Sequence, residues 1–142
     1  MILIAHRGNV DGASPFENTK RHIVRALRSG FDAEVDVWYQ DGWYLGHDRP
    51  EHLTDLTFLQ TRGLWLHCKN YAALQLALER GLHCFYHASE DYALTSRGYI
   101  WAFPGMAGGR KTICVMPEAG QSVKGFSGVC SDHVARYTPD SV

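Results

Sequence analysis

The sequence predicts an α/β fold whose strands run mainly parallel, and three observations support this. Short apolar stretches alternate with amphipathic segments along the chain, which is typical of βα units. A glycine closes several of the amphipathic segments, as Gly30, Gly63 and Gly81 do. The chain has 142 residues, which is enough for one domain with a sizeable core. We therefore predict a single domain over residues 1–142 with about seven strands.

Seven apolar stretches have the length and composition of strands. They are residues 2–5, 33–38, 64–68, 82–86, 99–103, 112–116 and 128–131. A further short strand is expected at residues 43–45, after the turn signal Asp41-Gly42. From residue 64 onward the stretches follow one another closely, so the helices between them are expected to be short.

Helix starts are predicted where capping residues precede amphipathic segments. Ser14, Pro15 and Glu17 together read as a capping box, which predicts a helix that Gly30 ends. Further helix starts are expected at Thr54 or Asp55, Asn70, Ser89 and Pro117.

Composition and charge exclude several classes of protein. The 14 basic and 15 acidic residues give a net charge of -1, so binding of nucleic acid by bulk electrostatics is not expected. No apolar run approaches the roughly 20 residues of a membrane helix, and no basic segment precedes the apolar residues 1–5, so no signal peptide is expected. The four cysteines lie far apart in apolar stretches, which favours buried free thiols and a cytoplasmic location over a zinc cluster or disulfides.

Polar residues that could take part in catalysis or metal binding follow the first predicted strand and lie within the second. His6 and Arg7 come directly after the first strand, and Gly8 allows the backbone to turn sharply there. Glu34 and Asp36 lie two residues apart in the second strand and therefore share one face. If that face is buried, a proton or a hard divalent metal must separate the two carboxylates; the alternative is an edge strand with solvated acids.

A second histidine is expected near the same rim. His47 follows the short strand at residues 43–45, which would bring it back toward the top of the second strand. Alone it is an ordinary surface histidine, but with His6 it forms a pair suited to general acid–base chemistry. His87 and Asp132 end later strands and could line the same rim.

Five short motifs carry a resemblance to a known family. They are His6-Arg7-Gly8, Pro15-Phe16-Glu17-Asn18-Thr19, Glu34-Val35-Asp36, Asp41-Gly42 and His47-Asp48. In order and spacing they resemble the glycerophosphodiester phosphodiesterases, part of the phospholipase-C-like phosphodiesterases, which are built on (β/α) barrels. The resemblance covers residues 2–69 and extends weakly to residues 128–132. It implies a compact or trimmed TIM-type (β/α) barrel with about seven parallel strands, because a full barrel has about 250 residues.

The resemblance also implies roles for individual residues. They are His6 and His47 as general acid and base, Arg7, Asn18 and Lys69 as substrate-binding residues, and Glu34, Asp36 and His67 as the metal site. The metal implied by the family is Mg²⁺ or Ca²⁺, and the substrate is a small phosphodiester of lipid metabolism.

The chain departs from the family pattern in three places. His67 stands where the family has a glutamate; as a ligand it would favour Mn²⁺ or Zn²⁺ over Ca²⁺, but it could equally be a core histidine or a substrate hydrogen-bond donor. Phe16 separates the family's adjacent proline and glutamate, so Glu17 could be only a helix cap. The short chain leaves little room for the region that recognises the alcohol beyond the phosphate.

The predicted function is metal-dependent hydrolysis of a phosphodiester by two-histidine acid–base catalysis. The attacking group would be water or a hydroxyl of the substrate itself. Two alternatives remain at this point: a catalytically silent module that binds phosphate or a phospholipid head group, and a structural or interaction protein. A second copy of the chain could pair as a homodimer and cover open strand edges.

Overall fold

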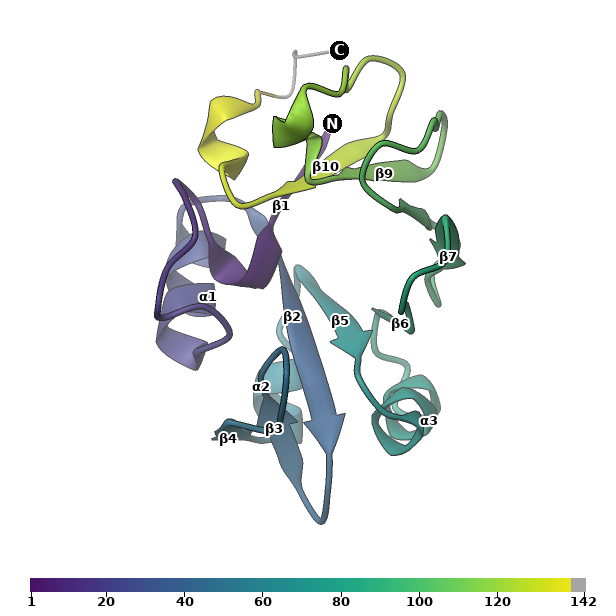
Figure 1. Cartoon of the computed structure of the whole chain (residues 1–142). Coiled ribbons are helices and arrows are strands. Elements are labelled where there is room, and N and C mark those ends of the chain that lie inside the picture. Colours follow the sequence, from purple (N-terminus) through teal and green to yellow (C-terminus); the bar gives the residue numbers. More distant parts are fainter. Residues whose placement is uncertain (139–142) are drawn as a thin grey trace.

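The structure is a computed structural model that describes residues 1–138, and its strands form one curved, mixed sheet (Figure 1). The strands in this range are β1 (Ile2–Ala5), β2 (Asp32–Tyr39), β3 (Trp43–Leu45), β4 (His52–Thr54), β5 (Leu64–Cys68), β6 (Cys84–Phe85), β7 (Tyr92–Leu94), β8 (Ile100–Ala102), β9 (Thr112–Val115) and β10 (Gly128–Ser131). The helices are α1 (Lys20–Arg28), α2 (Leu56–Leu59), α3 (Tyr71–Glu79) and the 3-10 helices η1 (His6–Gly8), η2 (Pro117–Ala119) and η3 (Val134–Arg136).

The central strand of the sheet is β1, which pairs in parallel with β2 on one side and β10 on the other. Beyond β10 the parallel order continues through β9 and β8, and β7 then pairs antiparallel with β8. Beyond β2 come β5 and β6, both parallel. The start of β2 pairs with β1, whereas the end of β2, residues 37–39, pairs antiparallel with β3. β3 in turn pairs antiparallel with β4. The sheet curves so strongly that its ends meet: Ser96 N–H, just after β7, donates to the carbonyl of Cys84 in β6 (2.8 Å).

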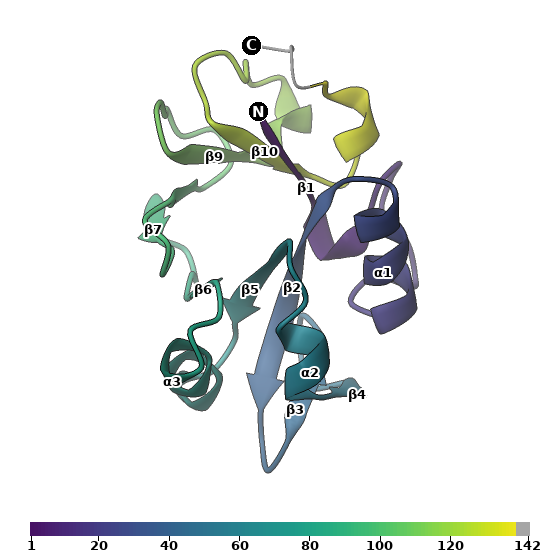
Figure 2. The ribbon, with the colours of Figure 1, turned by 180° about the vertical axis from the view of Figure 1, so that it is seen from behind.

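The predicted TIM-type (β/α) barrel is wrong. Over residues 1–138 the structure is a mixed sheet of ten strands with few helices, and only 22% is helical. In Figure 2 the three α-helices lie outside the curve beside β1, β2, β5 and β6, whereas the β8–β10 side carries only short 3-10 helices. Connection length explains the missing helix between β8 and β9, because only residues 103–111 join these strands and a helical crossover needs about a dozen residues or more.

One predicted helix is replaced by a strand. Ser89 was expected to open a helix, but residues 92–94 form β7, which pairs with β8 as a hairpin. The aromatic and apolar residues of this segment suit a strand as well as a helix, and the available edge of β8 decides between them. None of the helices in residues 1–138 combines the length and apolar character that crossing a bilayer requires.

The first helix begins later than predicted, so the capping box at Ser14 is wrong. Asn18 has a φ of 59°, and a residue in this left-handed region cannot continue an α-helix. The cap is instead Thr19, whose Oγ1 accepts a hydrogen bond from the backbone N–H of His22 (3.3 Å). Glu17 is therefore free to take part in other contacts.

Other sequence predictions are confirmed. Asp55 caps α2 by accepting from Phe58 N–H (2.8 Å), and Asn70 caps α3 by accepting from Ala73 N–H (3.1 Å). The short strand at residues 43–45 is β3. All four cysteines are buried free thiols.

The two faces of β2 have different surroundings. Val35 and Val37 belong to the core cluster that α1 and α3 cover on the outside of the sheet. Residues two apart in a strand share a face, so Glu34 and Asp36 project to the inner side. There the core is aromatic, with buried Trp65, Phe85 and Trp101 packed together. The alternation within β2 thus places two acids inside the curve.

Gly46, at the end of β3, has a φ of 151°, and a Cβ added there would overlap the backbone oxygen of Arg49. We expect Gly46→Ala to lower the free energy of unfolding by about 3 kcal/mol, because backbone strain and overlap act together. Gly30→Ala is the control: its φ is 89° but the space around it is open, so the loss is expected to stay at about 1–2 kcal/mol. Urea denaturation measures both, and equal losses would contradict the prediction.

Candidate active site

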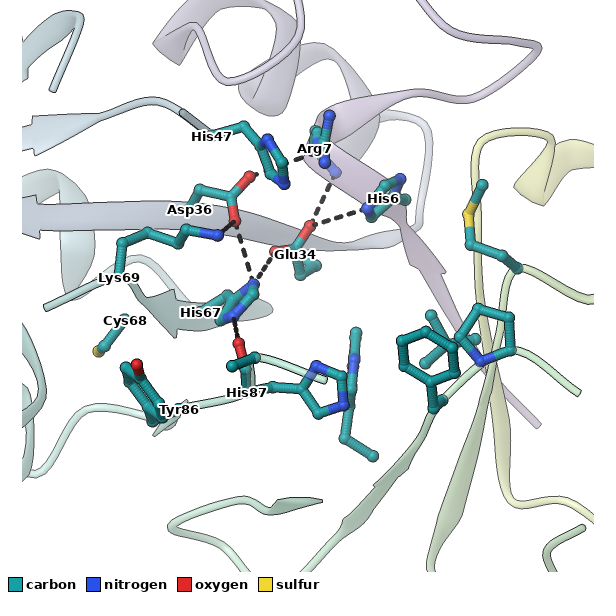
Figure 3. Close-up of a pocket in the computed structure, with 16 residues that line it drawn as sticks. His6, Arg7, Glu34, Asp36, His47, His67, Cys68, Lys69, Tyr86 and His87 are labelled. Atoms are coloured by element: carbon teal, nitrogen blue, oxygen red, sulfur yellow. Dashed lines mark hydrogen bonds and ion pairs between the residues drawn. The ribbon is translucent and has the colours of Figure 1, made fainter. Parts of the chain in front are cut away.

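The carboxyl ends of β1, β2 and β5 meet at a pocket of about 460 Å³. Parallel neighbouring strands end at the same edge, so residues far apart in sequence gather there. The predicted site residues that line this pocket are His6, Arg7, Glu34, Asp36, His47, His67 and Lys69. Figure 3 shows their side chains converging on the two carboxylates.

Three of these residues form a compact cluster of potential metal ligands. Glu34 and Asp36 are both only 1% exposed, and His67 pairs with them from the neighbouring strand. One ligand atom from each lies within 4.8 Å of the others. Nδ1 of His67 is 3.1 Å from an Asp36 oxygen and 3.6 Å from a Glu34 oxygen. This cluster could hold a divalent cation.

A backbone contact determines which nitrogen of His67 faces the acids. Nε2 lies 2.8 Å from the carbonyl oxygen of His87, and because a carbonyl only accepts, Nε2 carries a proton. Nδ1 is then the nitrogen directed at Glu34 and Asp36. A histidine whose second nitrogen donates to a carbonyl is the usual arrangement of a metal ligand. Two carboxylates and this imidazole fit a divalent metal of intermediate softness.

His67 and Asp36 shift each other's pKa values. Burial lowers the pKa of His67, but hydrogen bonds to Asp36 and Glu34 outweigh it and raise the pKa to about 9. Burial has the opposite effect on Asp36 and raises its pKa, but the contacts of Asp36 with His67 and Asn18 and the charge of Lys69 lower the pKa to about 2. Attraction between the protonated imidazole of His67 and the two carboxylates therefore stabilises the cluster.

Asn18 binds Asp36 through two hydrogen bonds and lies outside the pocket. Its amide nitrogen donates to Asp36 Oδ2 (2.9 Å), and its amide oxygen accepts from Asp36 N–H (3.0 Å). Asn18 is only 2% exposed and is not among the residues that line the pocket. Although the sequence predicted a contact with substrate, the structure places Asn18 where it orients a carboxylate.

Arg7 is bound to acids on three sides. Its backbone N–H donates to Glu34 (3.1 Å), its Nη1 pairs with Glu17 (2.9 Å), and its Nε lies 3.4 Å from Asp36. Burial alone would lower the pKa of Arg7, but the neighbouring carboxylates raise it. Glu17 also accepts from the amide of Asn9 (3.1 Å). Glu17 thus belongs to the site and does not cap the helix.

His6 is oriented by a carboxylate from the end of β10. Its Nδ1 lies 2.8 Å from Asp132, which also accepts from Asn9 (2.8 Å). Its Nε2 points toward the pocket, 3.9 Å from Glu34. Burial lowers the pKa of His6, but the hydrogen bond to Asp132 and the charge of Glu34 raise it overall. The pKa of Asp132 is lowered: burial acts against this, and the bond to His6 outweighs it.

His47 approaches the cluster from another side. Its Nδ1 contacts the adjacent Asp48 (2.8 Å), and its side chain is 42% exposed. Figure 3 shows it beside Asp36 and Arg7, with His6 beyond Glu34. The two histidines therefore border the acid cluster, and the side chain of His6 is less exposed (18%) than that of His47 (42%).

Some residues of the site had no clear signal in the sequence. Asn9 binds both Glu17 and Asp132, and also contacts His22 (2.9 Å), but no motif singled it out. Glu17 was obscured because the same local pattern is typical of a helix start. Asp132 was detectable only as a polar residue at the end of a predicted strand.

Comparison with known proteins gives no further guide to the function. No family model, curated protein or solved structure matches this chain. The resemblance to glycerophosphodiester phosphodiesterases stays a prediction from the sequence motifs.

Proposed function

We propose that the protein hydrolyses a small phosphodiester in a metal-dependent reaction, with His6 and His47 as the acid–base pair. The observation that carries the proposal is the buried cluster of Glu34, Asp36 and His67, with a histidine on each of two sides. A buried pair of acids in a pocket is costly unless it serves a cation. Two histidines beside such a cluster suit transfer of two protons during one displacement.

Arg7 and Lys69 are the groups that would bind the phosphate. Both lie close to Asp36, Arg7 at 3.4 Å and Lys69 at 3.8 Å. A bound divalent ion would neutralise the carboxylates and the negative charge that develops on the phosphoryl oxygens. The guanidinium, which suits two phosphate oxygens, and the ammonium could then turn to the substrate.

The two histidines are each held so that one nitrogen is left for chemistry. Asp132 engages Nδ1 of His6 and Asp48 engages Nδ1 of His47, so Nε2 of each ring is the reacting atom. One Nε2 takes the proton of the attacking water or substrate hydroxyl, and the other gives a proton to the leaving oxygen. Imidazole suits both tasks because its ordinary pKa of about 6.5 lies near neutral pH.

Hydrolysis of bis-p-nitrophenyl phosphate tests this proposal. We expect turnover with added metal, stronger with Mn²⁺ or Zn²⁺ than with Ca²⁺ because one ligand is imidazole, and loss of turnover with EDTA. Glu34→Gln should abolish metal binding and activity, whereas Glu51→Gln, which changes an exposed acid on the surface, should preserve both. Absence of turnover with every metal would overturn the enzymatic function.

One observation favours a second candidate, a silent module that binds phosphate or a phospholipid head group. His67 already supplies a positive charge beside the two acids when it is protonated, and Arg7 and Lys69 add further positive charge near Asp36, so the carboxylates can be compensated without a metal. Phosphate binding that is independent of metal and unaccompanied by turnover would support this candidate.

The proposed partner is the small-molecule phosphodiester and not a nucleic acid, because a net charge of -1 offers little attraction to a polyanion. The four free thiols suit a reducing compartment such as the cytoplasm. Pairing of two copies along the outer strand β4 is the homodimer that the sheet edge would allow.

A further inference from the structure

The pocket has a second wall whose chemistry differs from that of the acid cluster. It comes from the ends of β6, β8 and β9, and its main side chains are Tyr86, His87, Trp101, Phe103, Pro104 and Met116. All the aspartate, glutamate, arginine and lysine side chains that line the pocket, within the described residues, lie on the first wall. One wall of the pocket thus carries the charged side chains, and the other wall is mainly aromatic and apolar.

Contacts among its own residues hold the side chains of the second wall in place. The ring of Phe103 stacks on that of His87, with centroids 5.8 Å apart and an interplanar angle of 24°. His87 is held in turn by its Nε2, which lies 2.8 Å from the carbonyl oxygen of Glu90. Below them, buried Phe85 packs on Trp101 at 4.5 Å. A ligand would therefore meet a preformed aromatic surface, which lowers the entropic cost of binding.

This surface is open to water at the mouth of the pocket. Tyr86 is 48% exposed and Phe103 is 39% exposed. Exposed aromatic surface beside polar residues often marks a binding groove. The side-chain polar atoms on this wall are confined to the Tyr86 hydroxyl, the Trp101 indole and the second ring nitrogen of His87. A polyol such as glycerol would find few partners for its hydroxyls there.

The two walls meet at His87. Its carbonyl binds His67 Nε2, and the two rings lie 6.2 Å apart between centroids. An organic group joined directly to a phosphate at the acid cluster could therefore reach the aromatic wall without a spacer.

We infer that the second wall binds an apolar group esterified to the phosphate, so that the substrates are aryl or alkyl phosphodiesters in preference to glycerol esters. The inference rests on the proposed phosphodiesterase function and adds the chemistry of the substrate's organic group. Stacking and apolar burial against Tyr86, His87 and Phe103 would supply the selectivity.

Binding of phosphate monoesters to the Mn²⁺-loaded full chain tests the inference without requiring turnover. Calorimetry would compare phenyl phosphate, hexyl phosphate, glycerol 3-phosphate and inorganic phosphate. We expect phenyl or hexyl phosphate to bind at least about tenfold more tightly than glycerol 3-phosphate. A preference for phenyl over hexyl would identify a ring as the natural group, and the reverse would identify a chain; either supports the inference.

Variants of the wall provide the matched comparison. The double change Tyr86→Ser and Phe103→Ser should reduce the preference to less than about threefold while leaving inorganic phosphate affinity unchanged. Tyr71→Ser, which alters an exposed tyrosine on α3 outside the pocket, should retain the full preference. Circular dichroism and urea denaturation establish that each variant is folded.

The outcomes separate the inference from the function on which it rests. Equal affinity for all three monoesters, with intact phosphate binding, would overturn the inference and leave the phosphodiesterase proposal standing. Failure of every phosphate compound to bind would overturn the phosphate site itself, and the inference with it.

Discussion

Replacing His6 with alanine is expected to lower kcat for bis-p-nitrophenyl phosphate by about 10²–10⁴-fold, the usual range for one acid–base group. His47→Ala should have an effect of similar size, because the proposed mechanism needs both a proton acceptor and a proton donor. Steady-state kinetics at saturating metal measure the loss. His52→Ala, at an exposed histidine on β4, should leave kcat unchanged.

Asp132→Asn provides a more specific readout of the role of His6. The hydrogen bond from His6 to Asp132 helps to raise the pKa of His6. The uncharged amide of the Asp132→Asn variant should therefore let that pKa fall. The limb of the pH–rate profile that reports His6 should then move to lower pH, which a merely structural role of Asp132 would not cause. A His6→Ala protein with wild-type kcat, or a profile unmoved by Asp132→Asn, would remove His6 from the mechanism.

Stability of the metal-free protein is expected to fall by about 2–3 kcal/mol between about pH 6.5 and pH 9 because of His67. The folded-state pKa of about 9 lies above the unfolded value of 6.5. Below pH 6.5 both states are protonated and the imidazolium stabilises the folded cluster fully. As pH rises through about 9 the folded protein loses that proton, and Glu34 and Asp36 are left facing each other.

Urea denaturation over this pH range in EDTA measures the effect. His67→Gln cannot be protonated there and should lose the part of the slope that His67 supplies. The raised pKa of His6 contributes to the remaining slope with the same sign, and the pKa of Cys84, lowered to about 7 by its contact with Cys68, contributes with the opposite sign. His52→Gln should keep the wild-type slope. A divalent metal should restore stability at the upper end of the range, because it takes the position of the proton. A slope unchanged by His67→Gln would contradict the assigned protonation.

The residues of the acid cluster could be identified in advance because their placement depends on local rules. His6 and Arg7 follow directly from the end of a strand, and Glu34 and Asp36 share a face because successive side chains of a strand alternate. The turn and return strand that carry His47 were also visible as Asp41-Gly42 and the apolar residues 43–45. Such features involve few residues at short sequence separation.

The architecture and the supporting contacts depended on the tertiary structure. The barrel prediction failed because a βα rhythm does not reveal whether a short connection becomes a helix, a hairpin strand or a loop. Glu17 was mistaken for a cap because nothing in its neighbourhood signals the left-handed backbone of Asn18.

Which side chains stand at strand ends, and which share a strand face, could be read from the amino-acid order alone. The contacts that orient the site could not: Asp132 orients His6, the His87 carbonyl orients His67, and aromatic side chains line the opposite wall of the pocket. The bond between Asp132 and His6 joins residues 126 positions apart, and the bond between His67 and His87 links β5 to the segment that follows β6. Local backbone preferences act over a few residues, whereas these contacts form only when packing of the whole sheet brings distant segments together.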